Sequence, residues 1–467
     1  MTKIKILFVN YDIAGVNYFR TQTPAVKLNE NHSDKFQVEI NPNMDFSPEQ
    51  YATTLDYLKG FNIIHYHRVL HGDPKVMRQI ATELKAAGVV LVVDIDDYWE
   101  LDKTHPLYHF SKEGKTHLAI IDSLKQANYI TTTTDLFADE IRRVIPGAKV
   151  TVFPNSIDPV SMTQFADKRT ADPNGLVRIT YSAGSSHKHD VELLKDVVNV
   201  LNGDPETKGK FKMILAGWDT RGETTDVKFN ENFMKELQVR GLWTREMVKS
   251  INASNGDVNR IHGIPNELRA RYAGKVFSQN KRPIKDTESV YYEYEKIFTD
   301  NYRLISDKNY VDFLQQIKQE PYPNEGNYGR RWTRKANVYA EVLNETDISL
   351  APLVDHKFNR MKSNLKQVEV WSRRIPIVCT DVAPYNVDGK NWHNCVLIPN
   401  MKNGLFNKRL YMDWAKALKK LILDPALRDQ LGNQLYEDFK VKYHLDHVTK
   451  NRAEFYEQVV SKATVAA

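Results

Sequence analysis

The chain has 467 residues, of which 41% are hydrophobic and 27% are charged, as in an ordinary soluble globular protein. No stretch approaches the ~20 consecutive apolar residues that span a bilayer, and the start, "MTKIKILFVNYDIAG", is too polar for a signal peptide. The net charge of +6 is too small to indicate nucleic-acid binding by itself. We therefore expect a cytoplasmic protein of two or three domains.

The first third of the chain alternates apolar runs with helix-like segments. Runs at 3–11, 61–67 and 89–99 predict strands that are buried on both faces. The segment 73–88 has helical spacing and ends at a glycine, whereas Pro24 should break or restart the helix that follows the first run. Repeated strand–helix units of this length predict a parallel sheet with helices on both faces.

The same pattern restarts near residue 176 and continues through apolar runs at 211–218, 347–353 and 375–381. Cys379 lies in the last of these runs, so we expect a buried, reduced thiol rather than a disulfide. The closing region, 409–460, is charged and helical.

Residues 219–290 do not follow this alternation. They are polar and contain helix-like pieces such as "NFMKELQVRGLW". We interpret them as a helical insertion, which is either a solvated excursion or a lobe that binds an acceptor or a partner.

These patterns predict an α/β protein with two doubly wound parallel-sheet domains that face a cleft. The chain passes between the domains at "FPNSIDP" (153–159), where prolines and an asparagine interrupt it. We expect an N-terminal domain at 1–155, a C-terminal domain at 156–450 and a tail at 451–467 that can pack back on the first domain.

Ligands of such sheets bind at the carboxyl ends of the strands, so the loops after strands are where we expect the chemistry. In "YDIAG" (11–15), Gly15 could let the backbone approach a ligand, or it could serve an ordinary turn. No GxGxxG motif is present, which disfavours a nicotinamide or flavin site.

Two loops of the first domain carry polar residues directly after strands. In "HYHR" (65–68), His67 could act on hydroxyls and Arg68 could hold a phosphate, although satisfied core or rim histidines are an alternative. In "DIDDYW" (94–99), the acidic residues including Asp97 could bind a metal or sugar hydroxyls, or they could cap a helix. This pattern also resembles the DxD motif of GT-A glycosyltransferases.

The loop "GSSHKHD" (184–190) lies between a predicted strand and a predicted helix of the second domain. Small residues and a helix start present backbone N–H groups to an anion. Gly184, His187 and Lys188 are therefore candidates for binding a diphosphate.

The stretch "FNRMKSNLKQVE" (358–369) lies between two predicted buried strands, and a helix is expected from near Ser363 to Arg373. Lys362 and Lys366 could neutralise phosphate charge, and Glu369 could accept hydrogen bonds from the two hydroxyls of a ribose. A phosphate site beside a ribose site is a nucleotide site. The alternative is that these lysines and the glutamate solvate an exposed face.

The order of these motifs resembles that of GT-B glycosyltransferases, close to the retaining family-4 group (glycosyl transferases group 1). The resemblance covers nearly the whole chain except 219–290. "VTVFPNSID" (150–158) is similar to the segment that opens the second domain in that group, and "VEVWSRRIPIVCTDVAPY" (368–385) is similar to its donor site. It implies two Rossmann-like domains and transfer of a sugar from a nucleoside-diphosphate sugar to an acceptor hydroxyl, with retention and with no metal or other cofactor.

The resemblance also implies roles for particular residues. Glu369 would hold the nucleotide ribose, while Ser363 and Asn364 would meet the diphosphate. His67 would lie near the transferred sugar, and the acceptor would contact the Gly15 loop, His67, Arg68 and the Asp94–Asp97 cluster. Arg360, Lys362 and Lys366 are candidate cations for the leaving nucleoside diphosphate.

The sequence departs from the family pattern at two points. The first of the two glutamates that the family spaces seven residues apart would fall on Met361. The paired Arg and Lys that usually bind the diphosphate are replaced, by position only, by Lys188 and His187.

Three alternative functions remain. One is a metal-dependent GT-A enzyme that uses "DIDD". Another is a GT-B enzyme that modifies DNA bases, with 219–290 facing the DNA. A third is a non-catalytic scaffold that binds nucleotides, which Met361 would suit. The expected acceptor is a glycan, a lipid-linked molecule or another hydroxyl compound, and nucleic acid is not favoured.

Overall fold

The computed structural model describes residues 3–9, 15–41, 44–218, 223–254, 256–274, 276–283, 288, 290–298, 328–402, 405–406 and 409–466. The chain divides into a large unit, Met1–Trp218 with Glu293–Ala467, and a small unit, Asp219–Tyr292. The large unit holds two parallel six-stranded sheets, so the predicted pair of Rossmann-like sheets is confirmed.

The first sheet has the strand order β2-β1-β3-β4-β5-β6, with every pair parallel. Its connections reverse direction between β1 and β3, and ligands of doubly wound sheets bind at such a switch point. The strands are β1 Ile4–Val9, β2 Phe36–Asn41, β3 Ile63–His67, β4 Val90–Asp94, β5 Tyr129–Thr132 and β6 Val150–Val152. The helices are α1 Gly15–Asn17, α2 Thr23–Asn31, α3 Tyr51–Lys59, α4 Pro74–Ala86, α5 Tyr108–Glu113, α6 Thr116–Gln126 and α7 Asp135–Val144, with the π-helix η1 at Tyr18–Gln22.

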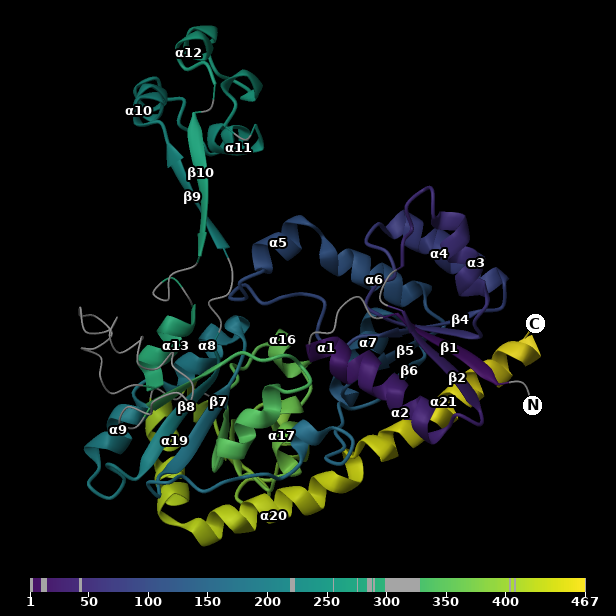
Figure 1. The fold of residues 1–467 in the computed structure, drawn as a ribbon, viewed down its shortest axis with the longest axis vertical. Helices are drawn as coiled ribbons and strands as arrows, with labels where there is room; N and C mark the ends of the chain where they lie inside the picture. The colour runs from purple at the N-terminus through teal and green to yellow at the C-terminus, as the bar shows by residue number, and fades with distance from the viewer. Residues whose placement is uncertain are drawn as a thin grey trace. The chain divides into compact units, whose positions relative to one another are not determined.

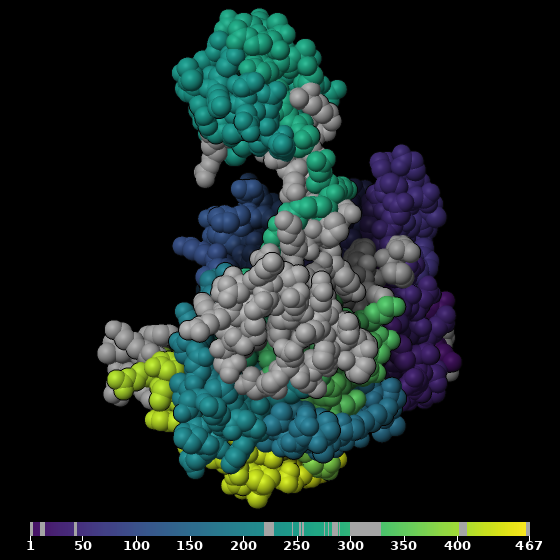
Figure 2. Space-filling model, turned by 60° about the vertical axis from the view of Figure 1, so that its left-hand side comes forward, coloured from purple at the N-terminus to yellow at the C-terminus, as the bar shows by residue number. Residues whose placement is uncertain are grey.

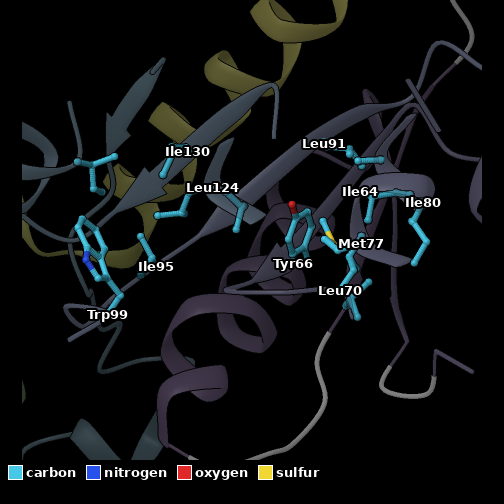
Figure 3. Packing of buried hydrophobic residues seen from close by; sticks show 14 of the residues in the cluster. Ile64, Tyr66, Leu70, Met77, Ile80, Leu91, Ile95, Trp99, Leu124 and Ile130 are labelled. Carbon is cyan, nitrogen blue, oxygen red and sulfur yellow. The ribbon is translucent and has the colours of Figure 1, made fainter. Parts of the chain in front are cut away.

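The core of this domain forms where helices cover the apolar face of the sheet. Figure 3 shows Ile64 of β3 and Leu91 of β4 beside Ile80 of α4, with Tyr66 close to Met77. All five side chains are buried. Burial of one such side chain contributes about 1.5–3 kcal/mol, and this fixes the strand ends that carry the polar loops.

The second sheet has the order β11-β8-β7-β12-β13-β14, also parallel throughout. Counted along the chain this is 3-2-1-4-5-6, the Rossmann order, with its switch point between β7 and β12. The strands are β7 Val177–Ser182, β8 Phe211–Trp218, β11 Tyr328–Trp332, β12 Ile348–Ala351, β13 Ile377–Thr380 and β14 Val396–Ile398. Its helices and 3-10 turns are η2 Thr163–Phe165, η3 Ser185–His187, α8 Lys188–Val191, η4 Glu192–Leu194, α9 Val197–Gly203, α13 Val290–Phe298, η7 Tyr339–Glu345, α16 Lys357–Arg360, α17 Leu365–Trp371, α18 Tyr385–Asp388 and α19 Leu410–Leu423. A short hairpin, β15 Met401–Lys402 and β16 Leu405–Phe406, follows β14.

Two long helices close the chain. Figure 1 shows α20, Pro425–Lys442, beside the second domain and α21, Leu445–Ala466, running along the first sheet. Val448 and Tyr456 of α21 share a buried cluster with Phe8 and Ile63. The last helix therefore ties the first sheet to the end of the chain.

The small unit contains a feature that the sequence did not indicate. Besides α10 Glu231–Val239, α11 Arg245–Ala253, the turn η5 Val258–Arg260 and α12 Asn266–Arg271, it has an antiparallel pair, β9 Glu223–Phe229 and β10 Phe277–Pro283. The helices of the insertion agree with the sequence, but the hairpin was not foreseen, because "ETTDVKF" and "FSQNKRP" are polar strands without an apolar run. The unit has its own core, which includes Phe233, Ile251 and Leu268.

Both cysteines, Cys379 and Cys395, are buried and free, which confirms the prediction of a reduced thiol at Cys379. No helix in the described ranges is long and apolar enough to cross a membrane.

Candidate functional site

The loops at the switch point of the second sheet are held together by one carboxylate, Asp190. Its Oδ1 accepts hydrogen bonds from the backbone N–H of Val354 at 2.7 Å and from Nδ2 of Asn359 at 3.0 Å. Its Oδ2 lies 2.8 Å from Nδ1 of His187. Asp190 thus joins the loop after β7 to the segment after β12. Its contact with Nδ1 also fixes the orientation of the His187 ring.

A glycine that the sequence analysis did not select shapes the loop after β7. Gly217 in β8 has a φ of +97°, and a Cβ there would lie 2.6 Å from the carbonyl oxygen of Ala183. At Gly184, in contrast, an added Cβ would meet nothing within 4 Å. The close backbone approach is therefore made at Gly217, which was hidden because it lies inside an apolar run.

Two apolar side chains of the stretch 358–369 pack against the first domain. Phe358 and Met361 are buried in the cluster of the first domain, together with Tyr98 and Trp99. The segment after β12 is therefore anchored in the core of the opposite domain. Met361, which takes the place of the family's first glutamate, thus has a packing role.

The structure ranks the three predicted cations of this stretch. Arg360 forms two hydrogen bonds with Asp355, at 2.5 and 2.9 Å, and Lys366 lies 2.9 Å from Glu369. Lys362 has no ion pair among the residues that the structure describes, and its ammonium lies over the Phe358 ring at 5.1 Å from the centroid. Lys362 is thus the cation whose charge is available to a ligand.

The charge of Lys362 acts on histidines of both domains. Burial and the charge of Lys362 lower the pKa values of His187 and His105. Burial, and to a smaller extent the same lysine, also lower the pKa of His356. These three imidazoles are therefore mainly neutral at pH 7. Each can bind a proton when an anionic ligand binds nearby.

Glu369 lies buried near this cluster, at 4% exposure. Its Oε1 accepts a hydrogen bond of 2.5 Å from the hydroxyl of Tyr339, and its Oε2 accepts one of 2.9 Å from Lys366. Each oxygen keeps a further lone pair for a ligand hydroxyl. Glu369 is thus fixed in place and still able to bind a diol.

The two polar residues before α17 make contacts within the protein. Ser363 Oγ accepts a hydrogen bond of 2.8 Å from Nδ2 of Asn155, and Nδ2 of Asn364 donates to the hydroxyl of Tyr443 at 2.8 Å. Ser363 therefore links the stretch 358–369 to the connection between the domains. Asn364 is held inside the second domain.

The first sheet contributes a second set of charges at its carboxyl edge. His67 Nε2 lies 2.9 Å from Asp96, and Arg68 lies 3.3 Å from Asp96 and 3.6 Å from Asp97. Burial and the charge of Asp96 raise the pKa of Asp97, and the charge of Lys362 opposes this shift. The charge of Lys362, from the second domain, thus acts on Asp97 of the first domain.

Asp94 lies beneath the site rather than in it. It is fully buried and accepts hydrogen bonds from Arg20, at 2.6 and 2.9 Å, and from Thr131 at 2.6 Å. Burial alone would raise its pKa, but Arg20 lowers the pKa to about 2. Within the described ranges no group of three or more His, Cys, Asp or Glu side chains could hold a metal ion.

Most of the predicted site residues come together, and a few lie apart. Gly15 begins α1 and is exposed, while the rest of "YDIAG" (11–14) lies outside the described residues. Lys188 is exposed and lines a cavity with Glu293 and Tyr294, and Lys362 is not part of that lining. Sequence reasoning included Asp96 and Asp190 only as parts of the quoted loops, and it missed three members of the site that no local motif marks: His105, Tyr339 and His356.

Comparison with known proteins identifies the fold. No protein-family model matches the sequence, and no curated protein matches it. Sucrose-phosphate synthase from Thermosynechococcus elongatus matches with a TM-score of 0.56 and 10% identity, over 99% of this chain and 100% of that one.

Two other solved structures match over nearly the whole of both chains. HepE of Anabaena in complex with UDP and glucose has a TM-score of 0.52 and 11% identity, over 98% of this chain and 100% of that one. An alpha-glucosyltransferase in complex with UDP-glucose and DNA containing an abasic site has a TM-score of 0.53 and 11% identity, over 97% and 98%. Together with the two Rossmann-like sheets, these matches show that the chain has the GT-B fold.

Proposed function

We propose that the protein is a glycosyltransferase that moves a sugar from a nucleoside-diphosphate sugar to an acceptor hydroxyl, with retention of configuration. The observation that carries the proposal is Lys362, which lies without an ion pair in the described structure where the carboxyl edges of the two sheets meet. The ligands of two proteins with this fold, UDP with glucose and UDP-glucose, support the choice of donor.

The donor would bind along the stretch 358–369. Glu369 would accept hydrogen bonds from the two ribose hydroxyls, and Lys362 would lie against the diphosphate. As the bond from sugar to phosphate breaks, negative charge grows on the leaving group, and a fixed ammonium in a partly buried site stabilises it. We propose that Lys362 supplies this charge without a metal ion, while Lys366 remains paired with Glu369.

The acceptor would bind at the edge of the first sheet. His67 and Asp97 present nitrogen and oxygen atoms to a hydroxyl, and Arg68 holds the carboxylates in position. A carboxyl with a raised pKa, such as that of Asp97, is suited to take up the proton that the attacking hydroxyl releases.

A thermal-shift panel with UDP, GDP, ADP, dTDP and CMP tests the donor site. One of these nucleotides, at about 100 times its dissociation constant, should stabilise the wild type by about 2.7 kcal/mol. The same nucleotide should not stabilise Glu369→Ala, because the ribose loses its hydrogen-bond acceptor. Glu437→Ala, on the exposed face of α20, is the matched control and should respond as the wild type does.

If a folded wild type responds to none of the five nucleotides, the donor site at 358–369 is wrong. The fold would then serve a non-catalytic protein, as Met361 in place of a glutamate would allow. A response that is equal in Glu369→Ala would keep nucleotide binding but remove Glu369 from it.

Donor affinity should depend on pH, because burial and Lys362 lower the pKa values of His187 and His105 in the free protein. A bound diphosphate raises these pKa values again, so binding takes up protons. The affinity for UDP-glucose should therefore increase as the pH falls from 8 to 6, by at most about tenfold per pH unit for each proton taken up.

Titration calorimetry at several pH values measures this effect. The diphosphate of UDP-glucose does not itself titrate in this range, so the change reports on the protein. His187→Asn should flatten the dependence, whereas His447→Asn, on an exposed face of α21, should leave it unchanged. Affinity that falls toward low pH would contradict the assignment of these histidines.

A further inference from the structure

The carboxylate of Glu369 is held by one donor on each oxygen, and the two donors come from different elements. The hydroxyl of Tyr339, in η7, donates to Oε1 at 2.5 Å, and the ammonium of Lys366, in α17, donates to Oε2 at 2.9 Å. A carboxylate held in this way cannot rotate without breaking a hydrogen bond. The protein therefore sets the direction of the remaining lone pairs before a ligand binds.

The backbone around Tyr339 is fixed by the side chain of Gln164, in η2. Nε2 of Gln164 donates to the carbonyl oxygen of Ala336 at 2.9 Å, and Oε1 accepts a hydrogen bond of 3.1 Å from the N–H of Ala340. Gln164 is 3% exposed, so water does not compete for these hydrogen bonds. One buried amide thus holds the chain on both sides of Tyr339.

Aromatic contacts from both domains hold the ring of Tyr339. It packs edge to face against Phe165, with 6.3 Å between the ring centroids, and against Phe19 at 6.4 Å. Phe19 belongs to η1 of the first domain but is buried in the apolar cluster of the second. In Figure 2 the purple N-terminal part of the chain borders the green part that follows residue 328. Tyr339 is therefore fixed at its backbone, its ring and its hydroxyl, and such a pre-organised group loses little freedom when a ligand binds.

The hydroxyl of Tyr339 also keeps its proton. Burial, and then the charge of Glu369, hold the pKa of this hydroxyl well above its usual value. Tyr339 therefore remains a hydrogen-bond donor to Glu369 at any pH at which the protein would be assayed.

We propose that Tyr339 is a positioning residue that orients Glu369 toward the two hydroxyls of the donor's ribose, so that the site selects ribonucleotides over deoxyribonucleotides. Each oxygen of Glu369 can accept one further hydrogen bond, and a ribose offers two neighbouring hydroxyls. A deoxyribose would leave part of a buried carboxylate unpaired, and this makes the discrimination strong. The inference rests on the proposed function, since it names the class of nucleotide for the same donor site and a residue that determines this class.

The alternative is that Tyr339 only satisfies a buried carboxylate and so serves the fold. Glu369 is 4% exposed, so some donor is needed there in either case. The two roles differ in what they predict. A residue that serves only the fold would change the stability of the protein and leave its preference among nucleotides unchanged.

Titration calorimetry with UDP and with dideoxy-UDP, which lacks both ribose hydroxyls, separates the two roles. Wild type should bind UDP at least about tenfold more tightly than dideoxy-UDP, as expected for hydrogen bonds to a charged acceptor. In Tyr339→Phe this preference should fall to about threefold or less, because the carboxylate can then turn toward Lys366 alone. The loss should appear in the affinity for UDP, while the affinity for dideoxy-UDP should stay close to that of wild type.

Tyr328→Phe is the matched control. Tyr328 lies in β11 of the same domain, is 2% exposed and donates to the carboxylate of Glu295 at 2.7 Å. The control thus removes a hydroxyl of the same kind, with a similar cost to stability, at a place that the donor does not contact. It should keep the wild-type preference for UDP. Thermal melting followed by circular dichroism shows that both variants are folded.

Three outcomes would overturn the inference. One is an unchanged preference in Tyr339→Phe. Another is an equal loss of affinity for UDP and dideoxy-UDP, which would mean that Tyr339 contacts the nucleotide elsewhere or serves only the fold. The third is a wild type that binds dTDP, a deoxyribonucleotide, as tightly as UDP.

The proposed function survives each of these outcomes, because a nucleotide still binds and only the selection by Tyr339 is wrong. If the thermal-shift panel names a ribonucleotide with another base, that nucleotide and its dideoxy form replace the UDP pair. A failure of every nucleotide in the panel would instead remove the proposed function, and the inference with it.

Discussion

Replacing Lys362 with Ala is expected to lower kcat by about 10²–10³-fold, the effect of removing one fixed group that stabilises transition-state charge. The loss should fall on kcat more than on the KM of the acceptor, because the charge on the diphosphate grows as the bond breaks. Steady-state kinetics with the donor that the thermal-shift panel identifies measures both constants. Lys362→Arg should recover part of the rate, since it restores the charge with a different shape.

Arg360→Ala is the matched comparison. Arg360 lies two residues away on the same stretch, but Asp355 neutralises it and it is half exposed. Its loss should therefore cost less than about threefold, because an exposed ion pair contributes at most about 1 kcal/mol. Equal losses at Lys362 and Arg360 would contradict the ranking of the cations. If EDTA abolished turnover while Lys362→Ala did not, a metal ion would have the role that we propose for the lysine.

The two sheets could be predicted from the sequence because strands buried on both faces are nearly continuous apolar runs. Ile6, Leu7 and Phe8 of β1 are all fully buried, and a run of this kind needs no knowledge of its neighbours. The β9–β10 hairpin could not be found in this way. Its strands are polar, and their pairing joins residues such as Phe229 and Phe277 that lie far apart in sequence.

The candidate site was predictable only where its residues are contiguous. The stretch 358–369 contains Lys362, Lys366 and Glu369 within one helical turn or two, so its composition was informative. Tyr339, which donates to Glu369, and His105, which lies near Lys362, come from other elements. Contacts of this kind depend on the tertiary fold, and no local pattern reports them.

The burial of position 361 explains why a methionine can stand where the family pattern has its first glutamate. A glutamate at this position would be buried at 7% exposure among apolar side chains, where a charge is costly without a partner. Methionine instead adds apolar contact between the stretch 358–369 and the first domain. A charged group is thus replaced by a contact between the domains. Lys362 then remains as the main charge for the ligand.

Asp94→Asn is expected to lower the free energy of unfolding by about 3–5 kcal/mol, because it leaves the buried guanidinium of Arg20 without its counter-charge. Arg20 and Asp94 are 1% and 0% exposed, so water cannot replace the lost partner. Urea denaturation followed by circular dichroism measures the change through the midpoint of the transition of the first domain. Asp122→Asn, which weakens the exposed pair with Arg78, should cost at most about 1 kcal/mol.

The pair also supports the site, and a second variant separates this role from stability. Arg20 donates to Oδ1 of Asn155 at 3.2 Å, and Asn155 in turn donates to Ser363. The double variant Arg20→Met, Asp94→Leu replaces both charges with apolar groups and should recover most of the lost stability. Because it still removes the contact to Asn155, donor binding should remain weaker than in wild type. Full recovery of both properties would mean that Ser363 is positioned without this chain of hydrogen bonds, and that the buried pair serves folding alone.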